Sequence, residues 1–469
     1  MSSAFFGLNT ALRGLVASQQ MLETAAHNTA NANTPGFSRQ RAQLVATPPY
    51  TYPAFNRSGL PGQIGTGVAV ATITRVRDAF LDLQIQSQSS IEGGWATRRD
   101  ELAKVESVVP EPSGSGLGTI LGRFWDAWQE VAADPSSSVA RAALVEQARS
   151  LGIRFSGDAA QLATLATGID DQLRQGVATV SDLASQVATL NAQIQQVQIS
   201  GDHANDLEDQ RNLLLDKLAQ IVPITLHPEA DGTVTVLVGG TDLVSGNRAR
   251  AMTTGPNGSG QLIPTWTDGT AVSISGGQLA ALVDVRDRQL ASYRTRLDTL
   301  AAGVADAVNA LHATGFDAAG NPGSAFFTYT AGNAAATLSV SAAIASNPAL
   351  VAAAGAPGQP GNGTIAGAIA DLRTGRLFSS GTQTASDFYA SLVGGIGTDS
   401  RQATEMAANQ SLVTGHLRQR RESISGVSLD EEAADMIRFQ HAYAAAARVI
   451  TTFDEMLDTL INKTGVVGR

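Results

Sequence analysis

Residues 5–37 read FFGLNTALRGLVASQQMLETAAHNTANANTPGF, and this stretch decides what kind of molecule the chain can form. Apolar side chains recur at alternating intervals of four and three residues, which is typical of a helix that packs along another helix. We assign this row as the N-terminal seam: Phe5, Leu8, Leu12, Leu15, Leu22 and Ala26. The helix should end within 31–36, because Pro35 cannot continue a helix and Asn and Gly tolerate left-handed backbone. Its only charges are Arg13 and Glu23, fewer than a solvated helix normally carries.

The other end of the chain carries a second long heptad pattern. We assign its two rows as the C-terminal seam: Leu429, Met436, Tyr443, Ile450 and Leu457, with Phe439, Phe453 and Leu460 in the row three residues further on. Glu432 alone breaks the second row. Ser428 followed by three acids is typical of a helix N-terminus, where a cap and negative charge are favoured. Neither terminal helix can bury its seam by itself.

Two interpretations of the terminal helices are open at this point. Each helix packs onto its own neighbouring domain, or the two pair as a coiled coil whose uncharged outer faces are buried by other subunits. We favour the second interpretation, because a helix left with a solvated outer face should carry more charge there.

The interior of the chain predicts helices with one β-rich interruption. Helical periods cover residues 121–131, 169–197, 207–221, 283–311 and 403–417. Within 222–276 the period changes to alternation. Asp231-Gly232 should turn between strands 224–226 and 233–238, and Asp268-Gly269 between strands 262–266 and 271–274.

These patterns predict a mainly α fold with a small β domain, in an elongated molecule of several domains. We place a terminal coiled-coil assembly domain at 1–45 and 425–469, a discontinuous helical bundle domain at 46–221 and 277–424, and an inserted β-rich outer domain at 222–276.

Composition excludes several function classes. The 469 residues include no Cys, which removes disulfides, thiolate metal sites and thiol nucleophiles. A net charge of -10 argues against a general nucleic-acid surface and against anionic membranes. Charged residues make up only 16% of the chain, and its 5% of aromatic residues makes a large aromatic core unexpected. We see no cleavable signal peptide and no apolar run of membrane-spanning length.

No catalytic or ligand-binding constellation emerges from the motifs. The histidines are scattered without metal-ligand spacing, and no phosphate-binding loop with its lysine or nucleophile elbow is present in the sequence. We therefore expect no enzyme activity, no catalytic residues, no cofactor and no metal. The informative features concern assembly.

The termini resemble those of bacterial flagellar axial proteins. The N-terminal resemblance lies in AHNTANANTPGFSRQ at 26–40, and the C-terminal one in SGVSLDEEAAD at 425–435 and RFQHAY at 438–443. The family motif at the N-terminus maps onto Asn28, Asn31, Asn33, Pro35, Gly36 and Phe37. In the middle of the chain, DGTVTV at 231–236 and GFD at 315–317 look like the hook-associated protein 1 family, the hook-filament junction proteins.

The resemblance implies a structural adaptor that joins hook to filament and has no enzymatic activity. Its implied partners are the hook protein, hook-associated protein 3, identical subunits in a ring, and an export chaperone at the C-terminal region, with no nucleic acid and no membrane among them. It implies an extracellular place in the flagellum, reached by type III export without a cleaved signal. Alternatives are another axial protein, such as hook-associated protein 3 or a hook protein, and a junction protein whose outer domain is adhesive.

Overall fold

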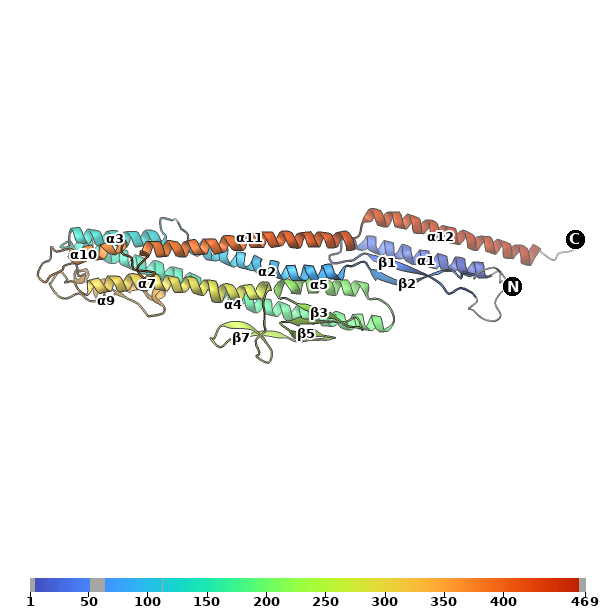
Figure 1. Cartoon of the computed structure of the whole chain (residues 1–469), viewed down its shortest axis with the longest axis horizontal. Coiled ribbons are helices and arrows are strands. Elements are labelled where there is room, and N and C mark those ends of the chain that lie inside the picture. The colour runs from blue at the N-terminus through green and yellow to red at the C-terminus, as the bar shows by residue number, and fades with distance from the viewer. Residues whose placement is uncertain (1–4, 51–63, 112, 464–469) are drawn as a thin grey trace.

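The protein is a long rod with both chain ends at one tip (Figure 1). The computed structural model describes residues 5–50, 64–111 and 113–463. For residues 5 and 463 it describes the backbone and not the side chain. At the tip with the chain ends lie α1 (Phe5–Asn31) and α12 (Leu429–Asp458), beside the hairpin of β1 (Gln40–Ala46) and β2 (Val68–Arg75). The mainly α, elongated architecture and the pairing of the two terminal helices follow the sequence prediction.

Long helices build the body of the rod. They are α2 (Ala79–Val108), α3 (Leu117–Ala133), α4 (Ser138–Ile199), α5 (Asn205–Ile221), α6 (Gly277–Asp284), a π-helical turn (Val285–Leu290), α7 (Ala291–His312) and α11 (Ala385–Ser425). Every interior helix that the sequence predicts is present, but two are much longer than the pattern indicated. α4 runs for 62 residues and α11 for 41. Side-chain caps fix where these two begin, at Ser137 and at Thr384, the latter within a full capping box.

One body helix was not predicted at all. The buried positions of α2 include Gln86, Ser89, Ser90, Gly93 and Gly94, so its inward face is polar or glycine in the middle. The glycines allow very close packing: a Cβ on Gly93 would lie 2.3 Å from the carbonyl oxygen of Gln220 in α5. A hydrophobic period cannot reveal a helix whose central contacts are made by backbone and small polar groups.

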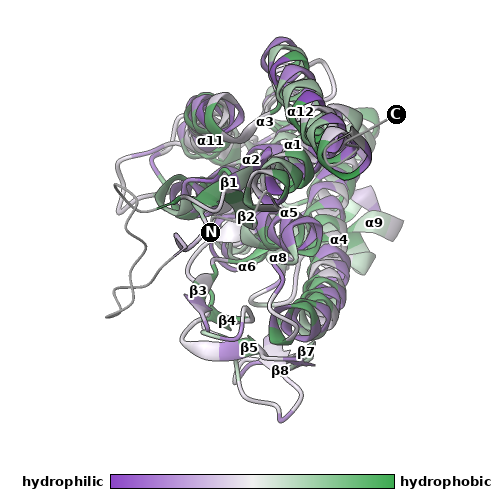
Figure 2. Cartoon of the chain, turned by 90° about the vertical axis from the view of Figure 1, so that its right-hand side faces the viewer, coloured by the Kyte–Doolittle hydropathy of each residue, from purple (hydrophilic) through white to green (hydrophobic). Residues whose placement is uncertain are grey.

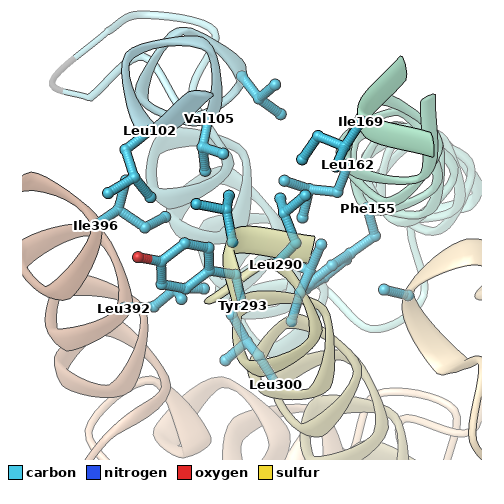
Figure 3. Packing of buried hydrophobic residues seen from close by; sticks show 14 of the residues in the cluster. Leu102, Val105, Phe155, Leu162, Ile169, Leu290, Tyr293, Leu300, Leu392 and Ile396 are labelled. Atoms are coloured by element: carbon cyan, nitrogen blue, oxygen red, sulfur yellow. The ribbon is translucent and has the colours of Figure 1, made fainter. Parts of the chain in front are cut away.

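The core of the body lies between four helices (Figure 3). Leu102 of α2, Ile169 of α4, Leu300 of α7 and Leu392 of α11 project toward one another and are all buried. Toward the tip away from the chain ends, the core becomes aromatic. The rings of Phe124, Trp125, Trp128, Phe326 and Phe327 pack on one another, and those of Trp128 and Phe326 also contact the buried His312. The rest of the core is mainly aliphatic, as the low aromatic content leads us to expect, and this cluster is a local exception.

The short elements at this far tip lie between residues 327 and 373. They are β9 (Phe327–Thr328), α8 (Ala334–Thr337), β10 (Ser339–Val340), α9 (Ala342–Ser346), a 3-10 turn (Pro348–Leu350), α10 (Thr364–Ala370) and a 3-10 turn (Asp371–Arg373). β9 and β10 pair antiparallel, and Phe327 of β9 belongs to the aromatic cluster.

The β-rich segment projects from the side of α4. It contains β3 (Thr225–Pro228), β4 (Val234–Val238), β5 (Thr241–Ser245), β6 (Arg248–Ala249), β7 (Met252–Pro256) and β8 (Leu262–Trp266). β3 to β6 form an antiparallel sheet in chain order, and β7 pairs with β8. Asn191 of α4 ties the sheet to the body, donating from Nδ2 to the carbonyl oxygen of Val234 at 2.9 Å.

One predicted hairpin in this segment is confirmed in full and the other in part. The Asp231-Gly232 turn joins β3 to β4 as expected, with Gly232 at φ 81°. The strand 262–266 pairs along its length with the strand before it, β7, which the sequence did not predict. After Asp268-Gly269 the chain does turn back beside this strand. Thr265 and Ala271 form an antiparallel bridge, and the N–H of Val272 donates to the carbonyl oxygen of Pro264. This pairing is short, so 271–274 does not form the full strand that we predict.

The β1–β2 hairpin is the part of the terminal region that the sequence did not predict. The domain boundary that we expect at residue 45 falls within β1, which pairs with β2 as far as Arg75. Both strands pack along α1, so in the structure the terminal helices and this hairpin lie together.

Candidate assembly interface

α1 and α12 lie antiparallel and make their closest contacts through small residues of α1. A Cβ added to Gly7 would lie 2.0 Å from Cζ of Phe453, so the phenyl ring occupies the space where a side chain would be. One heptad further along, a Cβ on Gly14 would lie 4.0 Å from Cβ of Ala446. Each step of seven residues forward in α1 therefore corresponds to seven residues backward in α12.

The row of α1 that faces α12 is displaced by one residue from the seam that we predicted. Its members are Gly7, Ala11, Gly14, Ser18, Met21, Ala25 and Asn28, and they repeat at the same alternating spacing. Ala11, Ser18, Ala25 and Asn28 are buried, at 8%, 4%, 2% and 2% exposure. Small residues let two helix backbones approach closely, and the larger apolar side chains of α12 then fill the holes.

The predicted leucine row lies at the edge of this contact and outward from it. Leu8, Leu15 and Leu22 are half-buried, Leu12 is 48% exposed and Ala26 is exposed, while the side chain of Phe5 lies outside the described part. α1 carries two heptad rows, and the less hydrophobic row faces α12. The predicted leucine row is therefore not the contact between the two terminal helices. That the leucine row contacts other subunits stays a prediction.

On α12 the predicted seam divides into two groups. Met436, Phe439, Ile450, Phe453 and Leu457 are half-buried and lie toward α1. Leu429, Tyr443 and Leu460 are 54%, 38% and 66% exposed. Only one residue between 429 and 458 is fully buried, and that residue is Glu432.

The outer surface of this tip carries many exposed apolar side chains, beside charges that lie mostly on α12, such as Arg448 and Glu455. Besides the residues above, Val16 on α1, Leu44 and Val45 on β1, and Ile437, Val449 and Met456 on α12 are each more than a third exposed. Figure 2 views the rod along its length from this tip, where α1 and α12 lie side by side. Exposed apolar helices side by side mark a surface that other protein covers.

Asn28 joins the three elements of the tip. Its Nδ2 donates to the carbonyl oxygen of Gln40 at 2.9 Å and to Oε2 of Glu432 at 3.2 Å, and its Oδ1 accepts from the backbone N–H of Gln40 at 2.9 Å. α1, β1 and α12 thus meet at one buried amide. Burial raises the pKa of Glu432, an effect that the Asn28 hydrogen bond and the positive charge of Arg39 oppose.

The remaining motif residues shape the turn that follows α1. Asn31 donates from Nδ2 to the carbonyl oxygen of His27 at 3.1 Å, whereas Asn33 and Pro35 are exposed. Gly36 has φ 83°, and a Cβ there would lie 3.2 Å from Cβ of Leu213 in α5. The Phe37 ring packs edge-on to the ring of His27, with centroids 5.4 Å apart. Gly36 is needed both for its backbone conformation and for its closeness to α5.

A buried ion-pair network attaches the terminal region to the body. Asp209 of α5 accepts from the backbone N–H and the hydroxyl of Ser38 at 2.7 and 2.8 Å. Nη1 of Arg75 and of Arg77 donate to the same carboxylate, at 2.8 and 3.3 Å. The Asp209 side chain is only 5% exposed, so it is fully paired in a region with little water.

Sequence reasoning missed Gln40, Arg75, Asp209 and the structural role of Glu432. Glu432 carried a signal, since it alone breaks an apolar row, but its place in the first turn of α12 suggested only a charge at a helix N-terminus. The partners of Asp209 are more than 100 residues away in sequence, and no local pattern connects them.

The described part of the chain holds no site with obvious chemistry. No group of three or more His, Asp or Glu side chains among the described residues is placed to hold a metal ion. None of the helices that the structure describes carries an apolar stretch long enough to cross a bilayer. A rod with an apolar pair of helices at one tip has the form of a polymer subunit.

Comparison with known proteins identifies the kind of assembly to which the chain belongs. Residues 102–327 match the family described as Flagellar hook-associated protein FlgK helical domain. Residues 8–37 match the Flagella basal body rod protein family, and 418–463 match Flagellar basal body rod FlgEFG protein C-terminal. The last two matches cover most of α1 and all of α12, the tip described above. The class is therefore that of flagellar axial proteins.

Full-length relatives narrow the class. The chain is 33% identical to "Flagellar hook-associated protein 1" of Bacillus subtilis over 511 aligned residues, which cover 100% of both chains. It is 27% identical to the protein of the same name from Escherichia coli K12, covering 97% of this chain and 99% of that one. The chain belongs to the flagellar hook-associated protein 1 family. It is a structural component of the flagellum, in a family that is not enzymatic.

A solved structure has the same fold. The flagellar hook junction protein FlgK from Burkholderia pseudomallei superimposes with a TM-score of 0.67 over 73% of this chain and 100% of that one, at 17% identity.

Proposed function

We propose that this protein is the adaptor between hook and filament, and that it is incorporated through the α1–α12 tip. One observation carries the proposal: in α12, a helix of 30 residues, Glu432 is the only fully buried residue. Apolar side chains such as Ile437 and Met456 are 57% and 51% exposed in the single chain, so further burial must come from other molecules.

We propose four kinds of partner for this surface. Identical subunits form a ring in which the outer face of α12 and the leucine row of α1 are covered by neighbours. The hook protein lies on one side of the ring and hook-associated protein 3 on the other. An export chaperone covers the C-terminal region before assembly, and the chain leaves the cell through the flagellar type III route without a cleaved signal, to reside in the extracellular flagellum.

Gene deletion and complementation test the proposal. Cells of the source organism that lack the gene should build hooks without attached filaments and should release unassembled filament protein into the medium. Expression of this chain from a plasmid should restore filaments. Normal filaments in the deletion strain would contradict the proposal. Loss of the hooks themselves would also contradict it, because the protein would then act earlier in assembly.

The outer β-rich segment supplies no observation that favours a second function. Arg250 and Asp268 form an ion pair at 2.6 Å and Arg250 stacks over Trp266, so the most distinctive side chains of this segment are engaged with one another.

A further inference from the structure

Apolar packing alone does not determine the register of α12 along α1, that is, which residues of the two helices lie opposite each other. The holes of α1 are Gly7 and Gly14, and the large knobs of α12 are Phe439 and Phe453. In the observed register Phe453 fills the hole at Gly7, and Gly14 faces only the methyl group of Ala446.

Sliding α12 by one heptad in either direction preserves this kind of packing. A slip of about 10 Å, seven residues at 1.5 Å each, brings Phe453 over Gly14 in one direction and Phe439 over Gly14 in the other. The rest of the α1 row consists of Ala11, Ser18 and Ala25, which accept almost any apolar neighbour. Apolar packing alone therefore allows two slipped registers besides the native one.

Polar groups distinguish the three registers. Only in the native register does the Glu432 carboxylate reach Nδ2 of Asn28, at 3.2 Å, where the two are 5% and 2% exposed. One slip places Phe439 against the Asn28 amide. The other places Glu432 beside Met21, where the nearest donor of the α1 row, the Ser18 hydroxyl, already donates to the carbonyl oxygen of Gly14 at 2.8 Å. A buried carboxylate without a partner is strongly disfavoured.

We propose that the Asn28–Glu432 pair is a register lock, which selects one heptad register between the two terminal helices. Asn28 is itself held by both its hydrogen bonds to the backbone of Gln40, so the lock has a fixed point on the β1–β2 hairpin. A single polar pair within an otherwise permissive seam is an established way to specify helix register. The lock determines which side chains of α12 lie beside which of α1 on the exposed tip. It does not depend on the proposed adaptor function.

Engineered disulfides can read the register directly, because the natural chain has no cysteine. Gly14→Cys with Ala446→Cys reports the native register, since the Cβ separation of 4.0 Å suits a disulfide. Met21→Cys with Ala446→Cys, and Ala11→Cys with Ala442→Cys, report the two slipped registers. Each intramolecular bond closes a very large loop and is detected on the full-length monomer by its faster migration under non-reducing conditions.

With Glu432 intact, the native pair should form and both slipped pairs should stay at background. In a Glu432→Leu background the native pair should slow, and the initial rate of at least one slipped pair should rise about tenfold or more, given the strength of a hydrogen bond to a charged group. Glu432→Gln keeps an acceptor for Asn28 and should restore the native pattern. Asp430→Leu, at an exposed position in the same turn of α12, is the matched control and should change nothing.

Two results would overturn the lock. If the native pair forms at an unchanged rate in Glu432→Leu and no slipped pair appears, apolar packing alone sets the register. If all pairs are lost in Glu432→Leu, then Glu432 holds α12 on α1 without selecting among registers. Failure of the native pair with Glu432 intact would remove the helix contact on which the lock rests.

Discussion

The body of the rod and its terminal tip bury their side chains in opposite ways. In the body, Phe124, Trp125 and Trp128 are at most 1% exposed, and the core continues between four helices toward the middle of the molecule. In α12, the largest side chains are half-exposed and the one buried residue is an acid. The body is stabilised by its own core, whereas the tip presents a contact of small residues and an apolar outer surface.

This difference separates two roles within one chain. Mutations in the body should act on the folding of the single chain, and mutations on the tip should act on assembly with little effect on folding. The predictions below test that separation, in order of the expected effect on the free energy of unfolding of the isolated protein.

Truncation of the aromatic core should have the largest effect. Trp128 is fully buried against Phe326 and His312, so Trp128→Ala should destabilise the body by about 3–5 kcal/mol through lost burial and a residual cavity. Urea denaturation followed by circular dichroism measures the change. Trp95→Ala, at a half-buried tryptophan beneath Arg98, should cost only about 1 kcal/mol. Equal costs for the two variants would mean that the aromatic cluster is not the main core.

Acid should weaken the same region through His312. Burial, chiefly, lowers the pKa of this histidine to about 4. Its neutral ring accepts from the backbone N–H of Ala352 at 2.8 Å and donates from Nδ1 to the carbonyl oxygen of Ser324. Because the unfolded chain binds the proton more tightly, stability should be full above about pH 6.5 and fall by about 1.4 kcal/mol per pH unit as the pH drops toward 4.

Urea midpoints between pH 4 and 7 measure this dependence. His312→Gln, which cannot titrate, should remove most of the decline below pH 6.5, whereas His441→Gln at an exposed histidine of α12 should leave it in place. An unchanged acid dependence in His312→Gln would assign the decline to other groups.

Much of the architecture is predictable from sequence because long helices repeat their apolar positions many times. The pairing of the termini and the positions of α4 and α7 rest on such repeats, and the β3–β4 hairpin rests on strand alternation around Asp231-Gly232. The unpredicted features rest on single contacts. α2 packs through Ser89, Gly93 and Gly94, where closeness of backbone replaces hydrophobicity, and the partner of Asp209 lies at Ser38.

The N-terminal seam shows why a correct period does not identify a contact. Two heptad rows run side by side in α1, and hydrophobicity favoured the row with Leu8, Leu12 and Leu15. The helix contact uses the neighbouring row, because Gly7 and Gly14 allow the backbones to approach and the knobs come from α12. Choosing between the rows requires knowledge of the partner surface, which no local pattern in α1 contains.

A side chain introduced into the hole at Gly7 should separate the terminal helices without disturbing the body. The Cβ of Gly7→Ala would lie 2.0 Å from Cζ of Phe453, so the ring must move, at a cost of about 1–3 kcal/mol to the docking of α12. Hydrogen exchange of the α12 amides should rise while exchange in α4 stays unchanged.

Gly14→Ala is the matched control for this substitution. Its new methyl group has only the Cβ of Ala446 nearby, at 4.0 Å, and alanine favours helix over glycine by about 1 kcal/mol. Exchange of α12 should therefore fall slightly or stay the same. Equal protection of α12 in both variants would show that Phe453 does not need the hole at Gly7.

The smallest effect on stability should accompany a severe effect on assembly. Val16 on α1 is 45% exposed, and Val139 in the first turn of α4 is 77% exposed. Val16→Asp and Val139→Asp should each change the free energy of unfolding by about 0.5 kcal/mol or less, as surface substitutions usually do.

Only Val16→Asp places a charge in the surface that we assign to contacts with other subunits, where it would be desolvated without a partner. Cells that express Val16→Asp in place of the natural protein should lose their filaments and their swarming in soft agar, while Val139→Asp cells keep both. Filaments of normal length on Val16→Asp cells, at normal protein levels, would mean that the surface of α1 around Val16 faces solvent in the flagellum. The tip and the body would then differ in their packing, and this difference would have no role in assembly.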